Sequence, residues 1–327
     1  MSSHSDGNGT RAGRASREKK VQNPVPLGIN YLLVIGIDQY QHCPKLYNAV
    51  KDATDVTGVL TEKYQFSKQL TFSLFDKAAT QDNIIAALKD LAKKVTPKDT
   101  VLIYFSGHGE YDEVLDVGYW IPVDGRLGKI GSFISFDLVM KVLKAVKSHH
   151  TFIIADSCYS GTLFTEKSLN KVLNRLEQKP SRWLITAGRN ELVLDGKPGD
   201  NSPFADSVLW HLRNNHQPRL RVSQFCNDII EDVGKNYDQV PRGASLKGVG
   251  DRGGEFMFRL KEYTLAVFDE EVAAAEEENR KRNLEEEKEA TEALAETRTT
   301  IEPAPKKEET PIQSMDDLRK GRKKGER

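Results

Sequence analysis

The chain has 327 residues, of which 38% are hydrophobic and 29% are charged, and its 48 basic residues balance its 48 acidic ones. This balance argues against nucleic acid or a membrane surface as the main partner. No apolar run approaches the roughly 20 residues that a membrane-spanning helix needs. We therefore expect neither nucleic acid nor a membrane among the partners.

The cysteine content points to a reducing compartment. Three cysteines, Cys43, Cys158 and Cys226, are too few and too scattered for a disulfide framework or a paired zinc site. The first 20 residues contain arginines but no apolar segment after them, so they do not resemble a secretory signal. The expectation is a cytoplasmic protein in which a thiol stays free to react, with no metal and no other cofactor.

The chain begins with a polar stretch and then changes to short apolar runs. Residues 1–26 are rich in Gly, Ser and Arg and are predicted to be a disordered basic arm. The apolar runs that follow are continuous rather than alternating, which is typical of strands covered on both faces. They predict strands at 31–37, 70–75, 100–106, 151–156 and 182–187.

Amphipathic stretches with helical periodicity lie between these runs. They predict helices at 48–64, 80–95 and 135–148, with Thr80 and Ser135 as N-caps. The pair His149–His150 is expected to close the third helix, where cationic groups suit the helix dipole. Alternation of strands and helices predicts a mainly parallel sheet in a three-layer α/β domain.

Two more helices, at 202–215 and 222–237, and a last strand at 254–260 complete the globular part. The predicted domain therefore spans residues 27–262. Residues 263–298 are rich in Glu, Ala, Lys and Arg without an apolar seam, which predicts a charged helical extension. Residues 299–327 are predicted to be a disordered tail.

Two of the predicted strands end in glycine loops that carry reactive side chains. The strand at 100–106 is followed by His108, and the strand at 151–156 by Cys158. Functional groups gather at the carboxyl ends of the strands in an open parallel sheet, so these residues meet if the two strands are neighbours. Each alone fits a bland interpretation, a structural loop histidine or a small buried thiol. The pair on matching strand ends favours a reactive site.

Such a pair has the chemistry of a thiol hydrolase. An imidazole lowers the pKa of a nearby thiol and later protonates the leaving amine. The backbone N–H groups of Cys158 and Gly109 would then stabilise a tetrahedral oxyanion. Cys43 and Cys226 lack a glycine turn and are expected to pack.

Five segments in the same order resemble the family of caspases, metacaspases and paracaspases, over about residues 27–261. They are LLVIGIDQYQHCPKLYNAVKDATDV, YFSGHGE, GYWIPVDG, IIADSCYSG and NSPFADSVLWHL. The separation of 50 positions between His108 and Cys158 also matches the caspase spacing. In motif the chain is most similar to prokaryotic metacaspase-like proteins. The resemblance implies a caspase-type three-layer sandwich with a mainly parallel sheet of about six strands, helices on both faces, and the charged C-terminal helix and tail in addition.

The resemblance also implies a cysteine endopeptidase. His108 would be the general base and acid, Cys158 the nucleophile, and Gly109 a part of the oxyanion hole. Family members of this kind are regulated proteases, often zymogens, in stress, cell-death or defence signalling. Their partners are protein substrates and, in some cases, an activating or inhibitory protein.

The residues around the nucleophile resemble metacaspases and paracaspases more than animal caspases, which use arginines to bind aspartate. Those relatives use an acid two residues before the nucleophile, here Asp156, and one in the first helix, here Asp52, to bind arginine or lysine. Glu191 is a looser match to a third pocket acid of paracaspases. Two carboxylates attract a cation through charge-assisted hydrogen bonds, so cleavage after Arg or Lys of exposed substrate segments is expected. Asp52 also fits a helix-face charge, and Asp156 a residue that orients the loop.

Regulation is weakly marked in the sequence. The acidic run at 110–116 lacks the spacing and the glycine of an EF-hand loop, so it predicts a solvated charge run rather than a calcium site. A protease that prefers basic residues could process itself after the nucleophile motif, where five basic residues follow: Lys167, Lys171, Arg175, Lys179 and Arg182.

Two other function classes compete with the peptidase. One is a catalytically idle interaction module that acts through the charged C-terminal helix. The other is a different thiol hydrolase or transferase, which is disfavoured because no phosphate loop or dinucleotide motif is present.

Overall fold

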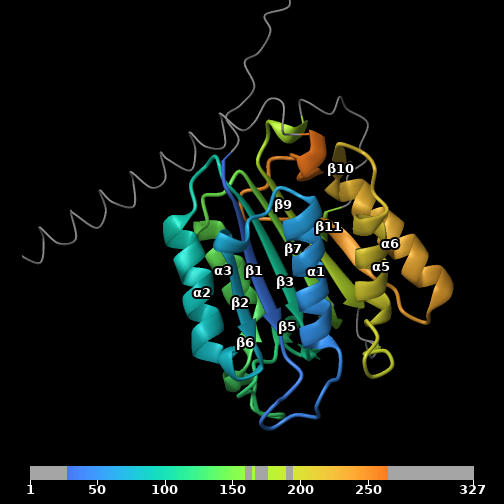
Figure 1. Ribbon diagram of the computed structural model, residues 1–327. Coiled ribbons are helices and arrows are strands. Elements are labelled where there is room, and N and C mark those ends of the chain that lie inside the picture. The colour runs from blue at the N-terminus through green and yellow to red at the C-terminus, as the bar shows by residue number, and fades with distance from the viewer. Residues whose placement is uncertain (1–27, 159–163, 166–175, 189–193, 264–327) are drawn as a thin grey trace, which may run out of the picture. The chain divides into compact units, whose positions relative to one another are not determined.

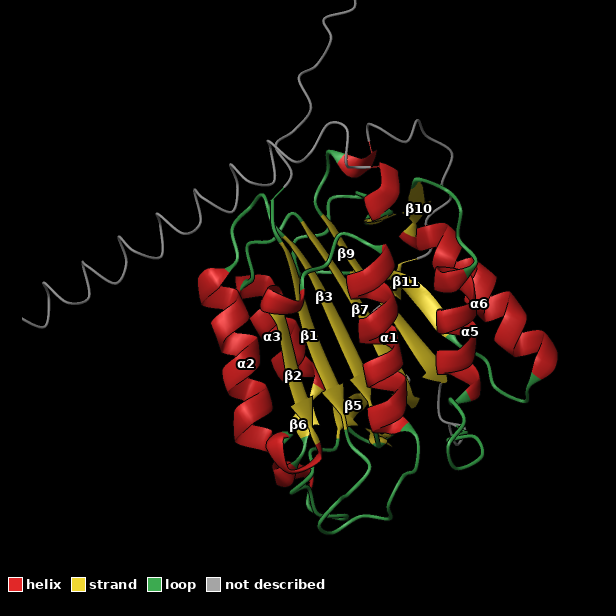
Figure 2. Cartoon of the chain, in the orientation of Figure 1, coloured by secondary structure: helices red, strands yellow, loops and turns green. Residues whose placement is uncertain are grey.

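The computed structural model describes residues 28–158, 164–165, 176–188 and 194–263. These residues form an α/β domain in which a central sheet lies between two layers of helices (Figure 1 and Figure 2). The sheet has the strand order β2-β1-β3-β7-β9-β11-β8. Its strands are β1 (Asn30–Gly36), β2 (Thr71–Phe75), β3 (Thr100–Ser106), β7 (His150–Cys158), β8 (Phe164–Thr165), β9 (Ser181–Gly188) and β11 (Arg242–Leu246).

The mainly parallel sheet expected from the sequence is confirmed. Strands β2, β1, β3, β7 and β9 are parallel to one another. Strand β11 runs antiparallel to β9, and β8 antiparallel to β11. The carboxyl ends of the parallel strands lie along one edge of the sheet, so the loops that follow β1 and β3 lie there beside the end of β7 (Figure 1).

Helices cover both faces, which explains the continuous apolar runs in the strands. Helices α2 (Gln81–Lys94) and α3 (Phe136–Ala145) pack on one face, and α1 (Ala49–Lys63), α5 (Pro203–Arg213) and α6 (Val222–Asn236) on the other (Figure 1). Odd-numbered β1 residues such as Leu33 and Ile35 pack into the α2–α3 cluster. Even-numbered ones such as Leu32 and Val34 pack into the α1–α5–α6 cluster. Both side-chain directions of a strand are therefore apolar.

Side chains at the predicted helix starts accept the expected hydrogen bonds. The Thr80 hydroxyl accepts from the Asn83 N–H, and the Ser135 hydroxyl from the Leu138 N–H. Both N-cap predictions are thus confirmed. Helix α1 is capped from a distance, because the Asp38 carboxylate accepts from the Ala49 N–H at 2.8 Å.

Two small sheets accompany the central one. The first is antiparallel and contains β4 (Gly109–Asp112), β5 (Val117–Trp120) and β6 (Ile134–Ser135). It begins directly after His108, and the acidic run at 110–116 forms its first hairpin. The second pairs β10 (Arg219–Arg221) with β12 (Met257–Arg259).

The last predicted strand is shorter than expected and lies in a small ladder. The apolar segment at 254–260 contains β12, but this strand joins β10 in the small ladder and not the central sheet. The place beside β9 is taken by β11, whose sequence RGASL is half-exposed and has no apolar run. The sequence pattern therefore could not reveal β11.

The interpretation of His149–His150 as a helix end is wrong. Helix α3 ends at Ala145, and His150 is the first residue of β7, buried with its Nδ1 2.7 Å from the Ser181 hydroxyl. Burial lowers the pKa of His150 to about 3, so this ring is neutral at physiological pH. The His149 Nε2 lies 2.9 Å from the Glu177 carbonyl.

Candidate functional site

The backbone brings His108 and Cys158 to matching positions on neighbouring strands. Strands β3 and β7 are adjacent and parallel, and Ser106 of β3 pairs with Asp156 of β7. His108 and Cys158 each lie two residues beyond this pair. Adjacent strands are about 4.8 Å apart, so the topology puts the two residues at one edge of the sheet. Strand β7 has a register irregularity between Ala155 and Cys158, after which Cys158 pairs with Gly188 of β9.

The imidazole of His108 is held by the loop that follows β1. Its Nε2 lies 2.8 Å from the Pro44 carbonyl oxygen, which can only accept a hydrogen bond. The Tyr40 hydroxyl accepts a 2.7 Å hydrogen bond from the His108 backbone N–H, and the two rings lie 4.7 Å apart. The Nε2–H tautomer fits this contact and leaves the Nδ1 lone pair free for another partner.

Gly109 follows His108 and is the first residue of β4. It pairs with Trp120 of β5, and the neighbouring Ile121 N–H donates to the His108 carbonyl at 3.0 Å. The small sheet therefore fixes the backbone on one side of His108, while Tyr40 fixes it on the other.

Asp52 and Asp156 are both buried and meet at Ser202, the N-cap of α5. The Ser202 N–H lies 3.3 Å from both carboxylate oxygens of Asp52, and its hydroxyl donates to Asp156 Oδ2 at 2.5 Å. The same hydroxyl accepts from the Ala205 N–H at 2.9 Å. Asn201 adds a 2.7 Å hydrogen bond to Asp52. One helix start thus joins an acid from α1 to an acid from β7.

Burial makes the charged forms of this pair costly. Desolvation raises the pKa of Asp52 to about 7, against hydrogen bonds from Asn201 and Ser202 that lower it. Desolvation and then the nearby Asp52 charge raise the pKa of Asp156 well above its usual range. Two carboxylates in one buried site cannot both ionise cheaply without a cation.

The two oxygens of Asp156 differ in their contacts. Asp156 Oδ1 is buried and has no hydrogen-bond partner among the described residues. No lysine or arginine in the described ranges forms a salt bridge with Asp52 or Asp156. A buried carboxylate without a donor or a counter-ion gains both a hydrogen bond and a compensating charge from a cationic donor.

Glu191, the predicted third acid, lies outside the described residues. Asp195 lies nearby in the sequence and is described, and its charge raises the pKa of Asp52, Asp156 and Asp38. Its Oδ2 accepts from the Tyr47 N–H at 2.7 Å, so it is fixed to the loop after β1. Sequence reasoning missed Asp195, Ser202 and Tyr40, because their contacts with the site are made across the fold. Tyr40 and Ser202 lie within the quoted segments, but nothing local marks their roles.

The five basic residues considered for self-processing have different positions. Lys167, Lys171 and Arg175 lie outside the described residues. Arg182 is buried in β9, where its guanidinium donates to the carbonyl oxygens of Val146, Ser148 and His149. A protease needs an extended, accessible segment, so Arg182 is excluded as a cleavage site in the folded chain.

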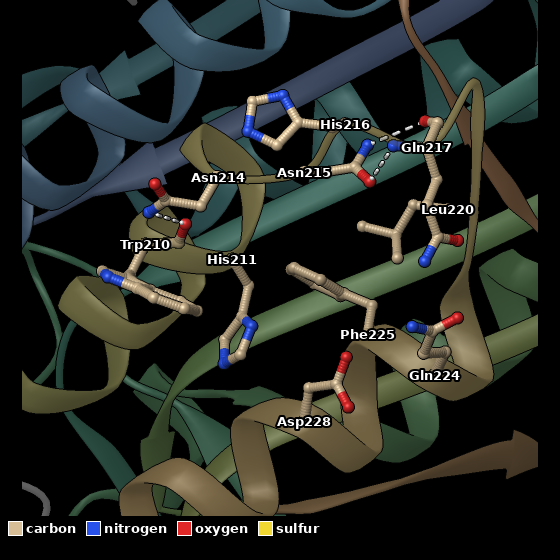
Figure 3. A pocket seen from close by; sticks show the side chains of 10 residues that line it. All are labelled: Trp210, His211, Asn214, Asn215, His216, Gln217, Leu220, Gln224, Phe225 and Asp228. Carbon is tan, nitrogen blue, oxygen red and sulfur yellow. Dashed lines mark hydrogen bonds between the residues drawn. The ribbon is translucent and has the colours of Figure 1, made fainter.

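A hollow of about 320 Å³ lies elsewhere, between the end of α5 and the start of α6 (Figure 3). Trp210, His211 and Phe225 are among the side chains that line it. Helix α5 begins at the acid pair and ends at this hollow, so the two are separated by the length of the helix. The hollow contains none of the predicted site residues.

Two further observations bear on the expected partners. Helices in the described ranges are all too short or too polar to cross a bilayer. In the same ranges, no three His, Cys, Asp or Glu side chains are placed to hold a metal ion.

Comparisons with known proteins agree with the sequence motifs. The family described as the caspase domain matches residues 29–247. Metacaspase-1 of Pyricularia oryzae is 30% identical over 234 residues, which are 65% of this chain and 59% of that protein. Metacaspase-1A of Neurospora crassa is 29% identical over 242 residues, 65% of this chain and 51% of that protein. The chain thus spans about half the length of these relatives.

A crystal structure of a protein from Geobacter sulfurreducens has the same fold. It aligns with a TM-score of 0.51 at 21% identity and covers 67% of this chain and 93% of its own. The family match spans more than half of the chain and includes both strand ends described above. The chain therefore belongs to the caspase-domain family of cysteine peptidases, and its curated relatives are metacaspases.

Proposed function

We propose that this protein is a cysteine endopeptidase that cleaves proteins after arginine or lysine. The observation that carries the proposal is the buried pair Asp52 and Asp156 beside the strand ends of His108 and Cys158, with Asp156 Oδ1 lacking a partner among the described residues. A guanidinium or ammonium group of the substrate would supply the missing donor and the missing positive charge.

The reaction follows from the roles of the two residues. The Cys158 thiol transfers its proton to His108, and the thiolate attacks the carbonyl carbon of the scissile bond. The carbonyl oxygen becomes an oxyanion that backbone N–H groups of Cys158 and Gly109 stabilise. His108 then protonates the leaving amine, the C–N bond breaks, and an acyl-enzyme remains. Water, deprotonated by His108, hydrolyses the thioester and restores the thiol.

The contact of His108 with Pro44 supports this assignment. The carbonyl oxygen at 2.8 Å favours a hydrogen on Nε2, which leaves Nδ1 as the basic nitrogen that would take the proton. The same carbonyl stabilises the imidazolium once it forms, because its dipole points at the positive ring.

The pocket explains the preference. Arginine and lysine compensate the two acids, whereas aspartate at this position would add a third negative charge to a buried site. Asp195 belongs to the same charge cluster, and Glu191 stays a predicted member of the pocket. The thiol mechanism suits a reducing cytoplasm. The same proposal includes protein substrates, control by a partner protein, and a role in stress, cell-death or defence signalling.

The experiment compares fluorogenic peptides that end in Arg, Lys or Asp, with the wild type and Cys158→Ala. We expect turnover of the Arg and Lys peptides by the wild type and none by the variant. Parallel assays with calcium and with cell extract test whether activity requires calcium or a partner protein. Absence of turnover in every condition would refute the proposal and favour an interaction module. Equal turnover of the Asp peptide would refute the pocket assignment alone.

A further inference from the structure

The loop between β1 and α1, residues 37–48, contacts His108 at both its backbone and its ring. The Pro44 carbonyl meets the ring at Nε2, and the Tyr40 hydroxyl accepts the backbone N–H at 2.7 Å. The Tyr40 ring also lies against the imidazole, with centroids 4.7 Å apart and planes at 43°. His108 is therefore held at its main chain, its ring face and its Nε2 by residues that lie about 65 positions away in the sequence.

This loop is fixed by hydrogen bonds to the body of the domain. Asp76 Oδ1 accepts from the backbone N–H groups of Asp38 and Gln39, both at 2.8 Å. The Gln41 N–H donates to the Val123 carbonyl at 2.9 Å, on the far side of Tyr40. Tyr40 is thus anchored on both sides along the chain, and only 5% of it is exposed. A loop held in this way can position a side chain as rigidly as a strand.

The glycine before His108 fits this contact. A Cβ at Gly107 would lie 2.5 Å from the Tyr40 hydroxyl oxygen, closer than any real contact permits. Gly107 therefore makes room for the hydroxyl, which explains in part why the residue before the histidine has no side chain. Because burial raises the pKa of Tyr40 far above its usual value, the hydroxyl stays neutral.

We propose that Tyr40 is a positioning residue, which holds the main chain and ring of His108 so that Nε2 stays on the Pro44 carbonyl and Nδ1 faces the thiol. The inference rests on the proposed role of His108. Loss of the hydroxyl leaves the His108 N–H without its partner, and the segment 107–109 is then free to shift. A displacement of about 1 Å costs up to about 100-fold in rate when a proton has to be transferred between fixed groups.

The test compares Tyr40→Phe with Tyr64→Phe. Tyr64 is an equally buried tyrosine whose hydroxyl donates to the Leu212 carbonyl at 2.8 Å, between α1 and α5 and away from His108. Each variant loses one buried hydroxyl and keeps the ring. We expect kcat on an Arg peptide to fall about 10- to 100-fold in Tyr40→Phe with KM unchanged. Tyr64→Phe should keep both constants within about twofold. Equal kcat in the two variants would overturn the inference.

A second measurement does not depend on activity. In the Cys158→Ala background, ¹⁵N shifts of the His108 ring report which nitrogen carries the hydrogen. We expect an Nε2–H tautomer that Tyr40→Phe converts to a mixture, while Tyr64→Phe leaves it unchanged. An unaltered His108 spectrum in Tyr40→Phe would overturn the positioning role. If the wild type cleaves no Arg or Lys peptide but the spectrum still changes, the proposed function fails and the inference on Tyr40 stands.

Gly107→Ala supplies a second route if Tyr40→Phe does not fold. The added methyl group displaces the hydroxyl without removing it, so the same change in the ring spectrum is expected. A variant that folds with an unchanged ring spectrum would contradict the proposal.

Discussion

Asp52 and Asp156 lie in a site that opposes their own ionisation. Both are buried, and both have a raised pKa because desolvation is the largest influence on each. The folded chain therefore binds protons that the unfolded chain releases. In the absence of a cationic ligand, these two buried acids therefore lower the stability of the domain.

This conflict predicts a pH dependence for stability. The folded pKa of Asp52 is about 7 and its usual value is 3.8, so the folded state carries the extra proton between these values. The free energy of unfolding should fall as pH rises from about 4 to about 7, because the unfolded state has already released the proton that the folded state still holds. The raised pKa of Asp156 adds to this fall. Asp52→Asn should flatten this curve and be more stable than the wild type at pH 8. Urea denaturation at pH 5 and pH 8 measures both, and parallel curves would contradict the raised pKa.

The same variant should lose the function that the acid serves. Removal of one buried carboxylate should raise KM for an Arg peptide at pH 8 by at least about 10-fold, since a cation then faces one charge rather than two. A gain in stability together with a loss of binding is typical of a site that holds strained or like-charged groups. An Asp52→Asn variant with unchanged KM would show that Asp52 is a structural acid only.

At the scale of the element, the start of α5 has two tasks. Ser202 caps the helix through the Ala205 N–H and donates the same hydroxyl's hydrogen to Asp156. Ser135 and Thr80 cap α3 and α2 through similar hydrogen bonds but contact no acid of the site. Among these three helices, only α5 has a cap whose hydroxyl oxygen also contacts an acid of the site.

Alanine at each cap separates the two tasks. Ser202→Ala and Ser135→Ala should each reduce the free energy of unfolding by about 1 kcal/mol, the usual value of an N-cap. Only Ser202→Ala should raise KM for Arg and Lys peptides, by about 10-fold, because it removes a hydrogen bond to a charged group. Peptide kinetics beside denaturation curves for both variants give the result. Equal KM values in the two variants would show that Ser202 acts only as a cap.

At the scale of the molecule, the apolar runs predicted that helices cover both faces of the central sheet. The motifs predicted that the candidate site lies at the carboxyl ends of its strands. Leu32 to Ile35 are apolar at every position, which can only be satisfied by helices on both faces, as observed. The adjacency of β3 and β7, which the prediction of a site at His108 and Cys158 requires, is observed. Local sequence contained enough information wherever burial on both faces or a strand end decided the outcome.

The contacts that complete the site depend on tertiary structure. Nothing local in the sequence marks Tyr40, Ser202 and Asp195 as members of the site, because their contacts with it join segments far apart in the chain. Strand β11 was missed for a related reason, because its RGASL sequence pairs at the side of β9 with little apolar surface of its own. The interpretation of His149–His150 failed because a buried neutral ring and a capping cation look alike in sequence.

The last segment of the domain is locked to the chain that leads into β9. The Gly254 N–H donates to the Pro180 carbonyl, and the Glu255 N–H to the Leu176 carbonyl. A Cβ on Gly254 would lie 1.7 Å from the Lys179 carbonyl oxygen, which is backbone and cannot turn aside. Gly58, inside α1, is the opposite case, because a Cβ there would meet nothing within 4 Å.

Alanine at these two glycines should have opposite effects. Gly254→Ala should lower the free energy of unfolding by about 3 kcal/mol, because two backbone segments must separate to admit the methyl group. Gly58→Ala should raise it by about 0.5–1 kcal/mol, since alanine loses less conformational freedom than glycine in a helix. Denaturant unfolding of both variants measures the difference. A tolerated alanine at Gly254 would mean that the segment before β9 and the end of the domain are not packed together as the structure has them.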